Sequence, residues 1–153
     1  MKLIILLSLL FISALGCFSQ QSIKEQIIES ENIYWINYDT VDGIKIDYKF
    51  ETCSRNNNER WLVLRFTNLS LETKSITWNP IWYRDNDCVN CRNVEGREFN
   101  FTLTLDPKET VSGESCTADS RLFLFSSFIE KHPGMDDKKL TSFQFINLII
   151  KNI

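Results

Sequence analysis

Hydrophobic and polar residues alternate regularly from residue 44 onward. In residues 44–51 a charged residue follows each apolar one, the apolar residues being Ile44, Ile46, Tyr48 and Phe50. Successive side chains of a strand point to opposite faces, so this period of two predicts a strand that is buried on one face only. The turn pair Asp42-Gly43 stands immediately before it.

Six further segments carry strand signals, and they span residues 61–68, 75–83, 99–105, 109–113, 121–129 and 140–153. Pro80 lacks an N–H, so it predicts that its strand ends, bulges or lies on an edge there. Residues 121–129 are apolar on both faces, which favours a central place in a sheet. The apolar phase shifts near Asn147, which predicts a kink or bulge in the last strand.

These seven strands, with frequent turn signals and no alternation of strands with helices, predict an all-β fold, an antiparallel β-sandwich. The sandwich domain is expected over residues 44–153. Residues 20–43 are expected to form an N-terminal arm or short helix, because Ser22 to Glu31 is the only helical candidate. The residues expected in the core are Ile46, Tyr48, Leu62, Leu64, Phe66, Ile76, Trp78, Phe99, Phe101, Leu103, Leu122 and Leu124.

Residues 1–19 have the features of a signal peptide. Lys2 supplies the positive end, Leu3 to Leu15 form an apolar run, and small residues follow at Gly16, Cys17 and Ser19. The run is shorter than the roughly 20 residues of a permanent membrane helix. We therefore expect an exported protein, periplasmic or secreted, that is cleaved after Ser19.

A second interpretation of the same segment is a lipid anchor. Ala14-Leu15-Gly16-Cys17 resembles a bacterial lipobox, in which the cysteine is acylated and holds the chain at a membrane. Cys17 would then be the first residue of a membrane-anchored lipoprotein.

Charge and hydropathy narrow the choice of partners. The formal net charge is −3 and no cluster of Lys or Arg occurs, which argues against nucleic acid and anionic lipid as partners. No second apolar run approaches the length of a membrane span, so we expect none. No cofactor is expected either.

Three segments carry a resemblance to a known group of proteins: LRFTNLS from Leu64, ITW from Ile76 and LDPKETVSG from Leu105. They resemble exported bacterial immunoglobulin-like modules, in particular small, uncharacterised β-sandwich proteins of Gram-negative bacteria that carry paired cysteines. The likeness covers residues 44–153 and implies an immunoglobulin-like sandwich. It carries no active-site residue across.

Four cysteines lie beyond the export signal, and an oxidising compartment would pair them as disulfides: Cys53, Cys88, Cys91 and Cys116. They follow the first, third and fifth predicted strands, whose loops emerge at one end of an up-and-down sandwich, so one cluster is expected. Of three pairings, two join Cys88 and Cys91 outward to Cys53 and Cys116. We favour this outward pairing because longer closed loops restrict the unfolded chain more.

The same cysteines allow two other kinds of chemistry. Cys88-Val89-Asn90-Cys91 has the spacing of a redox motif, although Asp85 and Asp87 would raise the thiol pKa. Four thiolates could also hold zinc, although the second half of the set is not a Cys-x2-Cys pair.

Other candidate residues are weaker. Trp82 and Tyr83 flank the cysteine loop and cannot both point inward, so one of them marks a binding surface or shields the disulfides. His132 precedes a proline, and no Gly-x-Ser-x-Gly motif accompanies it, which argues against a hydrolase triad. The segment from Asp85 to Asp87 begins like a calcium loop but lacks the later Gly and Glu.

The sequence thus favours a non-catalytic exported module that binds a protein, a glycan or an envelope component. The alternative is a periplasmic thiol–disulfide or metal-binding protein that uses the four cysteines.

Overall fold

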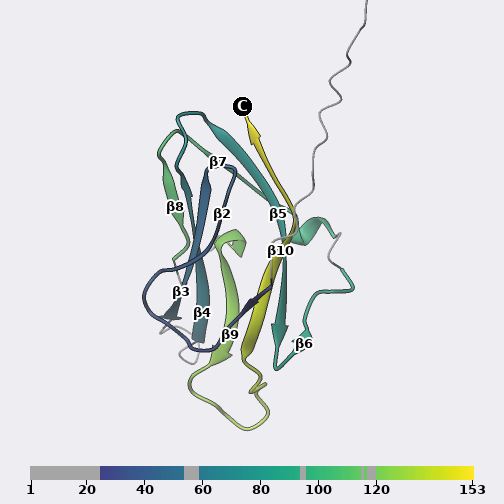
Figure 1. Cartoon of the computed structure of the whole chain (residues 1–153). Helices are drawn as coiled ribbons and strands as arrows, with labels where there is room; N and C mark the ends of the chain where they lie inside the picture. The colour runs from purple at the N-terminus through teal and green to yellow at the C-terminus, as the bar shows by residue number, and fades with distance from the viewer. Residues whose placement is uncertain (1–24, 54–58, 94–95, 115, 117–119) are drawn as a thin grey trace, which may run out of the picture.

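The computed structural model describes residues 25–53, 59–93, 96–114, 116 and 120–153. Within them, ten strands form two sheets whose pairings are all antiparallel, and the sheets pack face to face (Figure 1). The predicted all-β antiparallel sandwich is confirmed. Residues 1–24, which include the predicted export signal and Cys17, lie outside the described residues.

The strands are β1 (Gln26–Ile27), β2 (Ile36–Val41), β3 (Ile44–Cys53), β4 (Glu59–Asn68), β5 (Lys74–Arg84), β6 (Asp87–Cys88), β7 (Phe101–Leu105), β8 (Thr110–Ser112), β9 (Phe123–Phe128) and β10 (Leu140–Asn152). Two short 3-10 helices, η1 (Arg97–Phe99) and η2 (Ser120–Leu122), precede β7 and β9. The first sheet has the order β1-β10-β5-β6, with β7 also pairing with β5. The second has the order β2-β3-β4-β8, with β9 also pairing with β4.

All seven predicted strands are present as β3, β4, β5, β7, β8, β9 and β10, with ends within two residues of those predicted. Of the arm and the short helix expected over residues 20–43, the helix does not form in the described part, because Gln26–Ile27 is a strand that pairs with β10. β2 was also missed, so the sandwich begins before Ile44. β2 and β3 form a hairpin through Asp42 and Gly43, whose positive φ angles of 47° and 78° suit a two-residue turn.

β8 and β9 lie end to end along one edge of β4. β8 pairs with residues 65–67 of β4, and β9 pairs with residues 59–63. The chain leaves this edge after Gly113, where a Cβ would lie 2.5 Å from the Leu122 carbonyl oxygen, so only glycine fits. The predicted central place of residues 121–129 is wrong, because β9 pairs with β4 alone. Its outer residues are apolar because Phe123 and Phe125 pack edge-on against Trp61.

The core lies between the two sheets. Ten of the twelve predicted residues belong to its buried cluster, and Phe101 packs against it. Phe99 is the exception, since it lies in η1 and packs edge-on against Trp82 at 5.5 Å between ring centroids. The buried cluster also contains residues that were not predicted: Ile44, Phe50, Leu105, Leu140, Phe143, Phe145 and Leu148.

The sequence predicts an irregularity at Pro80 in β5 and another near Asn147 in β10. β5 does not end at Pro80, but its pairing with β7 stops at Trp78 and its pairing with β6 begins at Tyr83. Pro80 therefore lies at a local edge, as predicted. In β10, Asn147 has a positive φ of 51°, and the register to β5 shifts between Ile146 and Ile149, which confirms the predicted bulge.

A carboxylate is buried on the outer face of the second sheet. Asp47 is 1% exposed and accepts hydrogen bonds from Arg65 Nη2 at 2.7 Å and Asn37 Nδ2 at 3.2 Å, with Lys45 Nζ 3.2 Å away. Burial acts to raise the pKa of Asp47, but the hydrogen bonds from Arg65, Asn37 and Lys45 outweigh it and hold this pKa below its ordinary value. The Arg65 guanidinium also lies 4.2 Å from the Trp35 ring centroid.

We expect Arg65→Met to lower the free energy of unfolding by about 2 kcal/mol at neutral pH, because a charged hydrogen-bond donor is lost beside a buried carboxylate. A carboxyl with a lowered folded-state pKa stabilises the fold above its unfolded-state pKa. That stability is lost as the pH falls through the folded-state value. The variant should therefore lose less stability than the wild type on acidification. Urea unfolding between pH 7 and pH 2 measures this.

Lys49→Met is the matched control, because Lys49 also lies over Trp35, at 4.7 Å, but forms its ion pair with Glu51. It should cost about 0.5 kcal/mol and leave the acid profile unchanged. Identical acid profiles for Arg65→Met and the wild type would contradict the role assigned to Asp47.

Candidate functional site

The four cysteines form two disulfides, and the pairing that we favoured is wrong. Cys53 bonds Cys116 with a Cα–Cα distance of 5.5 Å, and Cys88 bonds Cys91 with a Cα–Cα distance of 5.7 Å. Cys53 ends β3 in the second sheet, whereas Cys88 lies on β6 in the first. Neither Cys53 nor Cys116 is bonded to Cys88 or Cys91, contrary to the outward pairing.

β8 and β9 lie along the same edge of β4, and Cys116 belongs to the segment between these two strands. All four sulfurs are in disulfides, so they do not form the four-thiolate zinc site. Among the described residues, no group of three or more His, Cys, Asp or Glu is placed to hold a metal ion.

The Cys88–Cys91 loop is held against the edge of β5. β5 and β6 are joined by a two-residue turn at Asp85 and Asn86, both with positive φ. Beyond β6, the Val89 N–H donates to the Trp82 carbonyl at 3.0 Å. The Cys91 N–H donates to Cys88 Sγ at 3.1 Å, across the small ring that the disulfide closes.

Asn90 takes the place of a strand beside Pro80. Its side chain is almost fully buried, its Nδ2 donates to the Pro80 carbonyl at 2.8 Å, and its Oδ1 accepts from the Trp82 N–H at 3.3 Å. These bonds satisfy β5 backbone groups in the gap between β7 and β6, where no strand pairs. Asn90 thereby fixes the position of the two cysteines that flank it.

A cavity of about 560 Å³ lies beside this loop. Trp82, Cys88, Cys91 and Phe99 contribute to its wall. Tyr83 Oη lies 3.9 Å from Cys91 Sγ. The structure thus brings Trp82 and Tyr83 together with the Cys88–Cys91 disulfide. Cys53 and Cys116 form the other disulfide. Both aromatic residues are partly buried, so their role as a binding surface stays a prediction.

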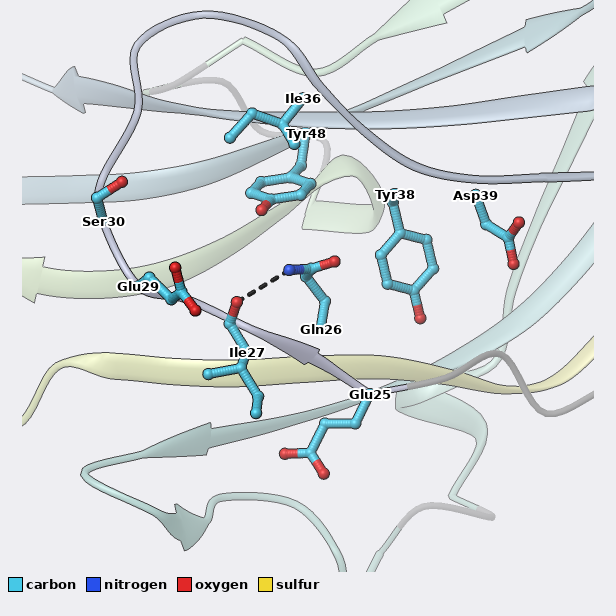
Figure 2. Close-up of a pocket in the computed structure, with 9 residues that line it drawn as sticks. All are labelled: Glu25, Gln26, Ile27, Glu29, Ser30, Ile36, Tyr38, Asp39 and Tyr48. Atoms are coloured by element: carbon cyan, nitrogen blue, oxygen red, sulfur yellow. Dashed lines mark hydrogen bonds between the residues drawn. The ribbon is translucent and has the colours of Figure 1, made fainter.

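A second pocket, of about 600 Å³, opens where β1 of one sheet faces β2 and β3 of the other (Figure 2). We call it the inter-sheet pocket. Its wall comprises Glu25, Gln26, Ile27, Glu29, Ser30, Ile36, Tyr38, Asp39 and Tyr48. Figure 2 shows the Gln26 side chain extending from β1 into the space between the two tyrosines, with its amide donating to the Ile27 carbonyl at 2.9 Å.

Both tyrosines of the inter-sheet pocket are fixed by packing. Tyr38 stacks on Phe143 at 5.0 Å, and its hydroxyl accepts a hydrogen bond from the Phe145 N–H of β10 at 3.3 Å. Tyr48 packs edge-on against the same Phe143 at 5.3 Å. Burial raises the pKa of both phenols. The Asp39 carboxylate adds to the rise for Tyr38, and the Glu29 carboxylate adds to it for Tyr48.

The inter-sheet pocket also carries uncompensated negative charge. It has three carboxylates, Glu25, Glu29 and Asp39, and none of them forms a salt bridge within the described part of the chain. Glu25 accepts a hydrogen bond from the Ser142 hydroxyl of β10. Sequence reasoning missed this pocket because it depends on β1 and β2. The alternation of Ile36 and Tyr38 before Asp42-Gly43 was the one signal that could have indicated it.

The weaker candidates stay apart from both pockets. His132 is exposed in the loop before β10. Asp85 belongs to the β5–β6 turn, and Asp87 forms an ion pair with Lys138.

Comparisons with protein-family models, with curated proteins and with solved structures found no match to this chain. Within the described residues, no helix has the length and apolar character needed to cross a membrane.

Proposed function

We propose that this protein is an exported β-sandwich module that binds a protein, a glycan or an envelope component through the inter-sheet pocket. The observation that carries the proposal is the pocket itself: an opening of about 600 Å³ with rigid aromatic walls and three carboxylates without salt bridges among the described residues. Its volume is within the range of small-ligand sites, which are concave and mostly formed before binding.

Export is supported by the cysteines and by residues 1–19. Both disulfides are of a kind that persists in oxidising compartments and is rare in the cytosol. An apolar run of signal-peptide length stands ahead of them in the sequence. We propose export in one of two forms. The protein is either soluble, in the periplasm or secreted, or anchored to a membrane at Cys17.

The lining of the pocket favours a positively charged group on the ligand. Carboxylates in a partly enclosed site attract a cation more strongly than they do in open water. Tyrosine rings offer both an apolar face and an electron-rich face to an ammonium group. A lysine side chain of a partner protein or an amino group of an envelope glycan has this chemistry.

We expect the double variant Glu29→Gln/Asp39→Asn to lose binding while it keeps its fold. The first measurement is a ¹⁵N–¹H NMR titration with the tripeptide Gly-Lys-Gly and with its Nε-acetylated form. The charged peptide should shift amides of residues 25–30 and 36–39, whereas the neutral one should not. The second measurement is capture of envelope components on the immobilised protein, in which the variant should fail to retain what the wild type retains.

Glu72→Gln/Asp137→Asn is the matched control, because it makes the same change in net charge at exposed sites outside the pocket. It should behave as the wild type in both measurements. Equal capture by the wild type and the pocket variant would place binding elsewhere on the molecule. An absence of both shifts and capture would exclude the pocket as a binding site.

A further inference from the structure

We propose that Cys88 and Cys91 form a thiol–disulfide exchange site, which accepts two electrons from a dithiol in an exposed peptide or protein segment. This inference does not depend on the inter-sheet pocket, which lies at β1 and β2 and shares no residue with the Cys88–Cys91 loop.

The two disulfides differ in how a thiol reaches them. Cys91 is exposed, and Val89 within the same ring is 51% exposed, so the Cys88–Cys91 bond lies at the surface. In the other disulfide Cys53 is only 3% exposed at the end of β3, and Cys116 is partly buried, so neither sulfur is as exposed as that of Cys91. Since exchange requires a thiolate to approach a sulfur in line with the S–S bond, an attacking thiol reaches Cys91 Sγ far more readily.

The hydrogen bonds of the loop favour one direction of attack. The Cys91 N–H points at Cys88 Sγ at 3.1 Å, and a hydrogen bond to a thiolate stabilises its charged form. Cys88 is therefore the better leaving group when Cys91 is attacked. Of the two acidic residues whose charge would oppose a thiolate, Asp87 forms an ion pair with Lys138, and Asp85 accepts a hydrogen bond from the Lys139 N–H.

The loop keeps its shape without the disulfide, because other bonds hold it to β5. Asn90 bonds the backbone at Pro80 and Trp82, and the Val89 N–H bonds the Trp82 carbonyl. These contacts lie between the two cysteines and remain when the S–S bond is broken. The reduced thiols consequently stay close enough to form the disulfide again. The neighbouring cavity offers the segment that carries the substrate dithiol both aromatic surface, from Trp82 and Phe99, and polar groups, among them Arg92 and Glu98.

The reaction is balanced in two steps. A substrate thiolate attacks Cys91 Sγ, the Cys88–Cys91 bond breaks, and its electron pair leaves on Cys88, which takes a proton from water. The second substrate thiolate then attacks the substrate sulfur of the mixed disulfide, and Cys91 leaves as a thiolate and is protonated. The substrate dithiol loses two electrons and two protons, and the Cys88–Cys91 pair gains them.

The test follows each disulfide separately during reduction by dithiothreitol, using alkylation and peptide mass spectrometry. Cys88–Cys91 should be reduced at least about tenfold faster than Cys53–Cys116, with an unchanged far-UV circular dichroism spectrum. A synthetic reduced dithiol peptide should then be oxidised by the protein in a 1:1 ratio. Cys88→Ala/Cys91→Ala should abolish this oxidation.

Two asparagine variants test whether Asn90 holds the two reduced cysteines close together. Asn90→Ala removes the contacts that hold the reduced loop and should slow re-formation of the disulfide by about tenfold. Asn100→Ala, the same change at an exposed position outside the loop and the cavity wall, should leave the rate unchanged. Reduction of both disulfides at one rate, or failure to oxidise the dithiol peptide, would overturn the proposal and would leave the inter-sheet pocket proposal unaffected.

Discussion

Replacing Cys53 and Cys116 together by alanine should lower the free energy of unfolding by about 4 kcal/mol, whereas the same change at Cys88 and Cys91 should cost about 2 kcal/mol. The first bond joins residues 63 apart in the chain and the second joins residues 3 apart. A longer closed loop removes more conformational freedom from the unfolded chain, so its loss is the more destabilising. Cys53 is also buried, so its removal leaves a small void.

Urea unfolding of the two double variants and the wild type, all under oxidising conditions, measures both losses. The transitions should remain cooperative, so that midpoint and slope give the difference in free energy. A larger loss from Cys88→Ala/Cys91→Ala than from Cys53→Ala/Cys116→Ala would contradict the disulfide pairing in the structure.

Asn68→Ala should lower the free energy of unfolding by about 3 kcal/mol. Asn68 is fully buried at the end of β4, and its Nδ2 donates to the carbonyls of Glu72, Leu105 and Asp106 at 2.8 to 3.2 Å. Its Oδ1 accepts from the N–H of Ser70 at 2.9 Å. One side chain thus closes the β4–β5 turn and fixes the end of β7 beside it. Alanine would leave these backbone groups without partners in a dry environment.

Asn100→Ala is the matched control, because Asn100 is exposed between η1 and β7. It should change the free energy of unfolding by less than about 0.5 kcal/mol. Thermal and urea unfolding of both variants measure these changes in the free energy of unfolding. Equal stabilities for Asn68→Ala and Asn100→Ala would mean that water replaces the buried amide, contrary to the expected result.

The alternation of apolar and polar residues was enough to locate the longer strands of the sandwich. Strands such as β3 and β7 alternate cleanly because one face is buried and the other meets water, and a period of two records that difference directly. β1 and β6 have only two residues each, so they contain no period to detect. They are strands because β10 and β5 offer them unpaired backbone groups, a cause that lies elsewhere in the chain.

The candidate sites depended on contacts that no local pattern encodes. The cysteine loop at residues 88–91 was located, but its pairing required the knowledge that β8 and β9 share one edge of β4. Apolar residues on both faces of β9 indicated a central strand, although Trp61 on the neighbouring strand was the real reason. The inter-sheet pocket is formed by two segments that meet only after both sheets are built.

The position of β10 sets the order in which the protein can be completed during synthesis. β10 lies between β1 and β5 in the first sheet (Figure 1). Its Phe145 N–H also donates to the Tyr38 hydroxyl of β2. β10 leaves the ribosome after every strand that it joins, so a nascent chain holds β5 and β1 without their common partner until the end. Domains form when their last long-range partner becomes available. The first sheet is therefore completed last, by the strand that joins β1 to β5.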